Sequence, residues 1–442
     1  MREMQSRLDY LWFIYRSELS WLVALGLFAL SLPFAWLPVE LVTVGAIIGA
    51  AAALVGLVGA GRSIFVTWRR AKLEQIARPI RGDVVAEWTP EGGHSAIVQH
   101  AGADRTAFWW DRDVNDALRW RSIGHDPVVG RVRAGRYRLP TRLQEIAGRG
   151  LRYGKVAGKA RRENRKLPIR FNGRLLRLAS EPTVEAIERG VLDFERVTYF
   201  DGECSNELWT ARAVVPGWSS AAGGDEAQGV VDRYACDRAG RMLALDYANV
   251  ANIVGISVLA VTTDGHAVLV RQSAGNSVAP SAWASSGSGS LERRDLHAAG
   301  SAGHAAEETV SHPFNAVGLI ISGMLRELRE ESLLTEEEID PVSARITAYW
   351  RWAERAMKPE FAGIVRLKVS AADLDRRKHR GTERAFSAQV VATPLQPLLD
   401  GVGRGESPLH GPMSPSCEVA ILAAADFLAS PEGVAWRSEP TA

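Results

Sequence analysis

Apolar positions gather in two long runs near the N-terminus and predict a membrane hairpin there. The runs cover about residues 20–37 and 41–60, are nearly uncharged, and each has the length of one helix that crosses a bilayer. Pro38 and Glu40 lie between them, where a short turn is expected. A cleaved signal peptide is the alternative, but the pairing of the runs and the lack of a polar region after the first favour two transmembrane helices.

Basic residues flank this hairpin and predict its orientation. Arg2, Arg7 and Arg16 precede the first run, further basic residues follow the second, and the turn between the runs has no Lys or Arg. Because positive charge accumulates on the cytoplasmic side, both termini are expected to be cytoplasmic in a multi-pass protein of the inner (plasma) membrane. Small residues along the second run allow close helix contact, either inside the hairpin or between copies in a homo-oligomer.

Beyond the hairpin, the pattern changes to short β-rich runs separated by turns. Between residues 83 and 130 these runs include the aromatic cluster Phe108-Trp109-Trp110, which predicts a small β-rich domain. Residues 255–263 and 267–272 are two further β-rich runs. They flank Asp264-Gly265, a dipeptide that favours the turn of a β-hairpin.

The hexapeptide Arg326-Glu327-Leu328-Arg329-Glu330-Glu331 predicts a cluster of negative charge. At about 100° per residue on a helix, its three glutamates lie on one side, while an apolar stripe that includes Met324 and Leu328 lies apart. Three carboxylates this close repel one another unless a cation neutralises them, and hard oxygen ligands suit Mg²⁺ or Mn²⁺. The alternative is a solvated helix whose Glu and Arg side chains pair three and four positions apart.

The order of these elements, a hairpin, a glycine-rich turn over residues 286–292 and an Arg-Glu-x-x-Glu-Glu helix, resembles the Nudix superfamily. That family's signature is Gly, five residues, Glu, seven residues, then Arg-Glu-apolar-x-Glu-Glu-x-Gly-apolar, and its glutamates bind the metal that activates water against a diphosphate. The resemblance covers about residues 195–400. It implies that Glu327, Glu330 and Glu331 bind the metal and that Arg326 braces them.

The resemblance also sets the expected fold class and domain organisation. The fold is expected to be α+β, a Nudix-like mixed sheet with flanking helices, preceded by a small β-rich region and an all-α transmembrane hairpin. The expected domains are residues 1–80 with the hairpin and a juxtamembrane basic segment, 81–190 with the β-rich region, and 191–442 with the Nudix-like domain and a C-terminal extension.

The signature is not continuous in this chain. Three positions depart from it: Gly318 in place of the first Glu, His312 in place of the first Gly, and Leu333 in place of the last Gly. If Gly287 or Gly289 is instead the loop glycine, residues 293 to about 315 become an insertion, which agrees with their richness in Ala, Gly and Ser. The motif is then split into two parts.

The segment from residue 131 to 177 carries the strongest local charge. It holds 16 Lys or Arg against two Glu, a net of +14, whereas the whole chain has a formal net charge of +2. Near a bilayer such a segment is expected to be drawn to anionic lipid, by about 1 kcal/mol per well-placed basic residue. The open alternatives are the phosphates of a small nucleotide, a solvated surface with ion pairs, and nucleic acid, which is the weakest because no nucleic-acid-binding motif accompanies the charge.

The three cysteines bear on the redox compartment and on the kinds of site that the sequence indicates. Cys204, Cys236 and Cys417 are scattered, have no metal-ligand spacing and leave one odd thiol. This usage suits a reducing compartment and gives no indication of disulfides or of a zinc site.

The sequence therefore predicts a membrane-anchored, Mg²⁺- or Mn²⁺-dependent hydrolase of a nucleoside diphosphate linked to another moiety. A general base is also needed, for which Glu360 is the first candidate and Glu354 the second. Asp201, Glu203 and Glu207 either line a substrate entrance or cap turns. The alternative function is a catalytically degenerate Nudix-like module that senses a nucleotide and passes the signal to the transmembrane hairpin in stress or defence.

Overall fold

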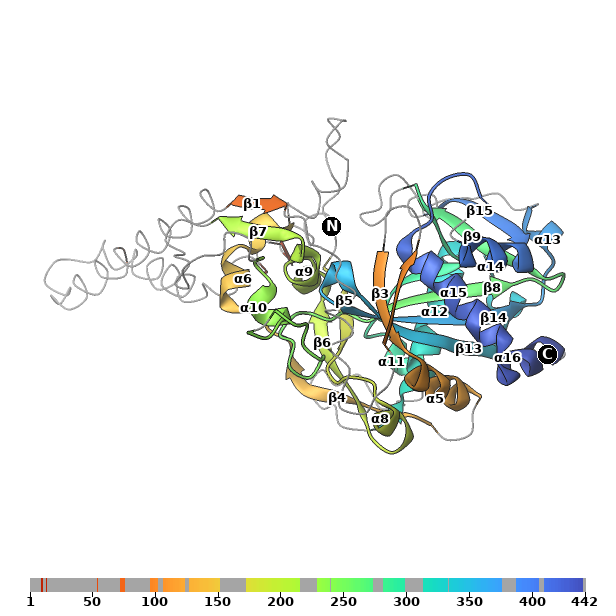
Figure 1. Ribbon diagram of the computed structural model, residues 1–442, viewed down its shortest axis with the longest axis horizontal. Helices are drawn as coiled ribbons and strands as arrows, with labels where there is room; N and C mark the ends of the chain where they lie inside the picture. Colours follow the sequence, from red (N-terminus) through yellow and green to blue (C-terminus); the bar gives the residue numbers. More distant parts are fainter. Residues whose placement is uncertain are drawn as a thin grey trace, which may run out of the picture. The chain divides into compact units, whose positions relative to one another are not determined.

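The structure is a computed structural model (Figure 1), and it describes residues 9–10, 13, 54, 72–75, 96–101, 106–123, 127–151, 172–214, 229–238, 240–272, 281–298, 313–332, 334–375, 387–404 and 409–439. Contacts within the chain divide it into two compact units. The first unit comprises Met1–Ile76, Leu139–Asn172 and Ala211–Val230, and the second comprises Ala77–Arg138, Gly173–Thr210 and Val231–Ala442.

The first unit contains an antiparallel pair of strands, β1 (Lys72–Gln75) and β7 (Ala211–Val214), and the helix α6 (Thr141–Glu145). Gln144 of α6 is buried, and its side-chain amide donates to the carbonyl of Phe13 at 2.7 Å. The two predicted transmembrane helices, residues 20–37 and 41–60, lie outside the described residues except for Leu54.

In the part of the chain that is described, no single helix is long and apolar enough to cross a bilayer. One bent pair, α15 (Pro415–Ala429) and α16 (Pro431–Ser438), meets the length and composition requirement together, with 88° between its two helices. The apolar residues of α15 are buried in the core of the second unit, so its composition is already explained by packing.

A nine-stranded mixed sheet forms the centre of the second unit. Its strands are β2 (Ala96–Ala101), β3 (Thr106–Asp111), β8 (Gly255–Val261), β9 (His266–Gln272), β10 (Trp283–Ser285), β11 (Gly287–Ser290), β13 (Ile339–Trp352), β14 (Lys358–Leu367) and β15 (Ser387–Pro394). The order is β10-β9-β8-β14-β13-β3-β2, with β11 also pairing with β8 and β15 with β9. In this sheet β8 and β14 form the parallel pair, and the other described pairs are antiparallel.

The predicted hairpin is confirmed, since β8 and β9 are antiparallel around the Asp264-Gly265 turn. Gly265 has a φ of +77°, a left-handed conformation that glycine adopts without steric cost. Farther from the turn, the Oγ of Ser286 accepts from the backbone N–H of Ala260 at 2.7 Å and donates to the carbonyl of Val268 at 2.5 Å. The hydroxyl thus separates the two strands, and β11 replaces β9 as the partner of β8.

Two helices, α12 (Ala316–Ser332) and α15, cover opposite faces of this sheet (Figure 1). Alternate side chains of β8 point to opposite faces: Ile256 lies beside Gly323 of α12, whereas Leu259 shares an apolar cluster with Ile421 of α15. Every residue of β8 is buried, as its continuous apolar run requires. The expected α+β class is correct at the level of a mixed sheet with flanking helices.

Residues 96–111 join this same sheet, although the sequence places them in a separate β-rich domain. In β3, Phe108 and Trp109 pair with Trp352 and Arg351 of β13. Phe108 is fully buried, and its ring centroid lies 5.9 Å from that of Trp350. The predicted boundary near residue 190 therefore does not separate these strands from the C-terminal region, because a β-rich pattern identifies a strand but not the strand that it pairs with.

A second, four-stranded sheet has the order β12-β4-β6-β5. Its strands are β4 (Val129–Arg136), β5 (Arg174–Leu178), β6 (Leu192–Thr198) and β12 (Phe314–Asn315). Residues 152–171 of the basic segment lie outside the described residues. At its described ends, Arg131 and Arg133 pair with Asp193 at 2.8 and 3.0 Å, and Arg177 pairs with Glu195 at 3.0 Å. Part of the basic charge thus contributes to ion pairs within the second unit.

The remaining helices of the second unit lie between or after these strands along the chain. They are α5 (Arg112–Ser122), α8 (Val184–Glu188), α9 (Tyr199–Glu203), α10 (Asp232–Ala235), α11 (Asp295–Ala298), α13 (Ala371–Asp375), α14 (Leu395–Gly403) and the 3₁₀ helices η5 (Asn206–Leu208), η6 (Glu336–Glu338) and η7 (Ala353–Arg355).

Substituting Phe108→Ala tests whether β3 belongs to the core of the second unit. Because Phe108 is buried against β13 and α15, its loss should lower the free energy of unfolding by about 3–5 kcal/mol. Urea unfolding followed by tryptophan fluorescence measures the change. Val342→Ala, at a position of β13 that is 74% exposed, is the control and should change it by less than about 0.5 kcal/mol. A small effect of Phe108→Ala would mean that β3 is not part of this core.

Candidate functional site

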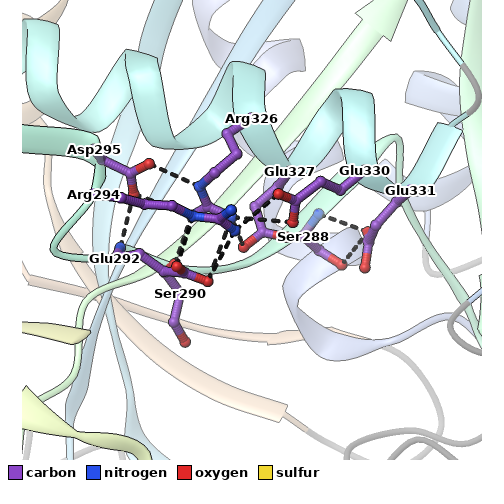
Figure 2. Close-up of polar contacts among 9 residues, drawn as sticks. All are labelled: Ser288, Ser290, Glu292, Arg294, Asp295, Arg326, Glu327, Glu330 and Glu331. Atoms are coloured by element: carbon purple, nitrogen blue, oxygen red, sulfur yellow. Dashed lines mark hydrogen bonds and ion pairs between the residues drawn. The ribbon is translucent and has the colours of Figure 1, made fainter. Parts of the chain in front are cut away.

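The acidic hexapeptide forms the last turns of α12. This helix begins after Asn315, whose side-chain oxygen accepts from the backbone N–H of Gly318 at 3.1 Å. Met324 and Leu328 are buried, as the apolar stripe predicts, and they hold the helix against the sheet. The opposite side directs Arg326, Glu327, Glu330 and Glu331 toward β11 and the residues that follow it (Figure 2).

Two glycines let β11 lie directly against α12. A Cβ atom at Gly287 would come within 3.0 Å of the backbone of Leu328, and one at Gly289 would come within 3.0 Å of the carboxylate of Glu327. Either distance is below a real Cβ contact, so any other residue would force the strand and helix apart or displace the carboxylate. Both glycines that the sequence offered as loop glycines therefore lie at the acidic turn.

Arg326 organises the charges at this turn. Its guanidinium donates to both carboxylate oxygens of Asp295, at 2.7 and 3.0 Å, to the carbonyl of Ser290 at 3.0 Å, and to Glu327 at 2.8 Å. Burial opposes its charged form, but Asp295 and Glu327 raise the pKa of Arg326 overall. The guanidinium thereby fixes the carboxylate of Glu327, which is the bracing role expected for Arg326.

Asp295 is the residue of this network that sequence reasoning missed. It is almost fully buried and lies on the short helix α11, directly after β11. Counting from Gly289 gives the signal that could have found it, because five residues separate Gly289 from Asp295. The same number separates the first Gly and the first Glu in the signature quoted above.

The three glutamates of the hexapeptide have different surroundings. Glu331 accepts from the backbone N–H of Ser288 at 2.9 Å, whereas Glu330 is more exposed and pairs with Arg294 at 2.8 Å. Burial, with a smaller contribution from neighbouring carboxylates, raises the pKa of Glu327 to about 7 and that of Glu331 to about 8. Burial therefore outweighs the positive charge near these two carboxyl groups and favours their neutral form.

The cluster also contains more acidic than basic groups. Among the residues drawn in Figure 2, five carboxylates face two guanidinium groups, an excess of three negative charges when all are ionised. Carboxylate oxygens are the ligands that Mg²⁺ and Mn²⁺ prefer, so the donor set of Glu327 and Glu331 fits a divalent cation. However, within the described ranges no three His, Cys, Asp or Glu side chains converge as a ready metal-binding group.

A cavity of about 350 Å³ opens beside Glu331. This volume is within the range of small-molecule sites. Glu360 lines the cavity together with Glu331, so the structure brings the first candidate base next to the acidic helix. Glu354, the second candidate, is not among the described residues that line it.

The acidic residues Asp201, Glu203 and Glu207, which precede β8 in the chain, have different surroundings. Glu203 and Glu207 line the cavity, as expected for a substrate entrance. Asp201 instead caps helix α9, where its carboxylate accepts from the backbone N–H and the hydroxyl of Thr198 at 3.0 and 2.5 Å. Two of these side chains thus face the cavity, and the third caps a helix.

Glu360 is buried in the wall of the cavity. Its carboxylate pairs with the ammonium of Lys358, and the guanidinium of Arg355 lies 3.8 Å away. It also occupies the space over Gly255, where a Cβ would overlap the carboxylate. Arg355 and Lys358 also line the cavity, from the turn between β13 and β14, and no pattern in the sequence pointed to them.

Comparison with known proteins adds little to this geometry. No family model and no curated protein matches the chain. Among solved structures, the chain is similar to DR0079 from Deinococcus radiodurans, with 16% sequence identity and a TM-score of 0.23 over 39% of this chain and 80% of that one. A likeness at this level carries no argument about fold or function.

The two glycines of β11 predict two different mutant phenotypes. Gly287→Ala should lower the thermal stability clearly, because the new Cβ meets helix backbone that cannot move aside. Gly289→Ala should leave the fold largely intact but displace the end of the flexible Glu327 side chain, and so weaken Mg²⁺ or Mn²⁺ binding. Thermal melts and metal titration of both variants measure the difference. Equal metal affinity in Gly289→Ala and the parent would contradict the assignment of Glu327.

The raised pKa of Glu331 predicts a pH dependence of stability. In the folded protein Glu331 has a pKa of about 8 and keeps its proton up to about that pH, whereas in the unfolded chain it loses the proton near the ordinary glutamate pKa of 4.5. Stability from this group is therefore present below about pH 4.5 and is lost as the pH rises to about 8. With a chelator present, the melting temperature of the parent should fall relative to Glu331→Gln across this window. Added Mg²⁺ should restore the parent alone, and parallel curves for the two proteins would contradict the expectation.

Proposed function

We propose that this protein is a divalent-metal-dependent hydrolase of the Nudix type that acts on a nucleoside diphosphate linked to another moiety. The observation that carries the proposal is the pair Glu327 and Glu331, two carboxylates with raised pKa values that lie on one helix turn against a glycine-rich strand. The cavity beside Glu331 has room for a ligand of this class.

The split signature supports the same proposal. Gly289, five residues and Asp295 match the first half of the pattern with Asp in place of Glu, and the hexapeptide from Arg326 matches the second half. The bidentate contact between Asp295 and Arg326 joins the two halves in space despite the residues inserted between them.

Each side chain has a defined part in the proposed reaction. Glu327 and Glu331 would hold the cation, and Arg326 orients Glu327. When bound, the cation would supply Lewis-acid chemistry, since it would offset negative charge on the diphosphate oxygens. Glu360 would accept a proton from the attacking water, because it is the candidate base in the same cavity.

The membrane anchor remains part of the proposal. The basic flanks of residues 20–37 and 41–60 support a hairpin with both termini in the cytoplasm, and therefore a cytoplasmic site at the inner face of the plasma membrane. The basic segment would add contact with anionic lipid. Association between hairpins would give a homo-oligomer.

One observation favours a second function, a nucleotide-sensing module without turnover. Glu330 is held by Arg294 at 2.8 Å and lies 3.5 Å from Arg326, so these arginines partly neutralise the third carboxylate that the signature assigns to the metal. A module with only two available carboxylates could bind a metal-nucleotide complex and signal through the hairpin without cleaving it.

Turnover of a panel of nucleoside-diphosphate-linked compounds by the full-length protein with Mg²⁺ tests the proposal. Glu331→Gln and Glu327→Gln should each reduce turnover at least about 100-fold, because each removes a charged oxygen ligand with little change in volume. Glu330→Gln should cost less, since its carboxylate is already paired with arginine. Formation of the two phosphomonoester products, the nucleoside monophosphate and the phosphorylated moiety, is measured by chromatography, with the exposed Glu337→Gln as the control.

The same panel separates the two functions. Binding of a nucleotide by the parent without formation of phosphomonoester products would favour the sensing module over the hydrolase. Full turnover by Glu331→Gln would contradict the assignment of Glu331 as a metal ligand, for the hydrolase and for the sensing module alike.

A further inference from the structure

The turn between β13 and β14 carries two basic residues of the cavity wall, Arg355 and Lys358. Between them, Ala356 and Met357 have φ values of +52° and +57°, a left-handed conformation that costs energy for residues other than glycine. The side chain of the buried Arg351 donates to the carbonyl of Met357 and holds the turn in this form. Strained turns of this kind persist where the surrounding structure requires a particular placement of side chains.

Each of the two cations has a carboxylate partner that also lines the cavity. Arg355 donates to Glu207, with its Nε at 2.7 Å, and its guanidinium stacks over the ring of Trp352 at 4.9 Å. Lys358 donates to Glu360. Burial lowers the pKa of Lys358, although Glu360 opposes the change.

The ion pairs Arg355–Glu207 and Lys358–Glu360 contribute little to the stability of the fold. Removing two charges from water costs about as much as their attraction returns, so buried ion pairs are weak stabilisers compared with packed apolar residues. Here both pairs border a cavity instead of filling a core. Among the described residues of its wall, Arg355 and Lys358 are the only Lys, Arg or His side chains, so an oxyanion that enters the cavity has no other cationic partner there.

We propose that Arg355 and Lys358 form a phosphate subsite. Without a ligand, Glu207 pairs with Arg355 and Glu360 pairs with Lys358, and a phosphate group of the ligand replaces these carboxylates when it binds. The subsite rests on the proposed function in one respect, namely that the ligand is a diphosphate whose other phosphate lies near Glu331. The exchange has a consequence for Glu360. Once Lys358 binds phosphate, the Glu360 oxygen that Lys358 held becomes available to accept a proton, so that ligand binding converts a counter-ion into a base.

Phosphate binding by the full-length protein in the presence of a chelator tests the exchange without metal or hydrolysis. Glu207→Gln removes the carboxylate that competes with phosphate for Arg355, so inorganic phosphate should bind more tightly. The expected gain in affinity is on the order of tenfold, which corresponds to one charge-assisted hydrogen bond. Arg355→Gln should weaken binding by a similar factor. Equilibrium dialysis with inorganic phosphate gives both values, and acetate as competitor should not displace the phosphate.

Glu203→Gln is the matched control, because Glu203 lines the same cavity but accepts from the hydroxyl of Tyr199 at 2.6 Å. It removes one negative charge from the wall but leaves Glu207 hydrogen-bonded to Arg355 and Glu360 hydrogen-bonded to Lys358, and so should change phosphate affinity less than Glu207→Gln does. Equal tightening in both variants would show a general charge effect and overturn the exchange, as would weaker binding in Glu207→Gln.

A second variant keeps the test decisive if Glu207→Gln does not fold. Glu360→Gln uncovers Lys358 in the same way and should also tighten phosphate binding in the chelator, whatever it does to turnover. Loss of phosphate binding in Glu360→Gln would overturn the subsite. Because no metal or nucleotide is present, a failure of the subsite and a failure of the hydrolase are separate results.

Discussion

The close approach of β11 to α12 is the constraint on which the site depends. Gly287 and Gly289 leave no side chain between the strand and the helix, so the carboxylates of Glu327 and Glu331 lie against the strand backbone. Burial then raises the pKa values of Glu327 and Glu331, so their charged form needs a nearby cation, the role given to the metal in the proposed function. A surface helix with the same hexapeptide would keep its glutamates solvated and would make no such demand.

The approach is itself a product of strand pairing. Ser286 separates β8 from β9 with two hydrogen bonds, and the chain that follows it takes over as the partner of β8. The glycine-rich segment is thereby turned toward the face covered by α12. After this segment, Asp295 accepts two hydrogen bonds from Arg326, which in turn holds the carboxylate of Glu327. The position of this carboxylate therefore depends on a residue that is distant from it in sequence.

The cavity beside this helix has walls of opposite character. One side carries the acidic helix, and the other carries two cations that are each neutralised by a carboxylate of the protein. This arrangement keeps the buried charges satisfied without a ligand, and in the proposed function it would give a metal-bound diphosphate a partner at each end. Both the hydrolase and the sensing module need such recognition, and they differ in whether Glu360 then acts on water.

The sequence alone determined the local features, because these depend on neighbours in the chain. The Asp264-Gly265 hairpin and the acidic turn of α12 follow from turn chemistry and helical spacing. The bracing by Arg326 was implied only by the family resemblance of the hexapeptide. Tertiary structure decided the rest. The pairing of β3 with β13, the contact of Asp295 with Arg326, and the meeting of Arg355 and Lys358 with Glu331 at one cavity join segments far apart in the chain. Periodicity shows which face of an element is apolar, but it does not name the partner, since any complementary apolar face or free strand edge satisfies the same pattern.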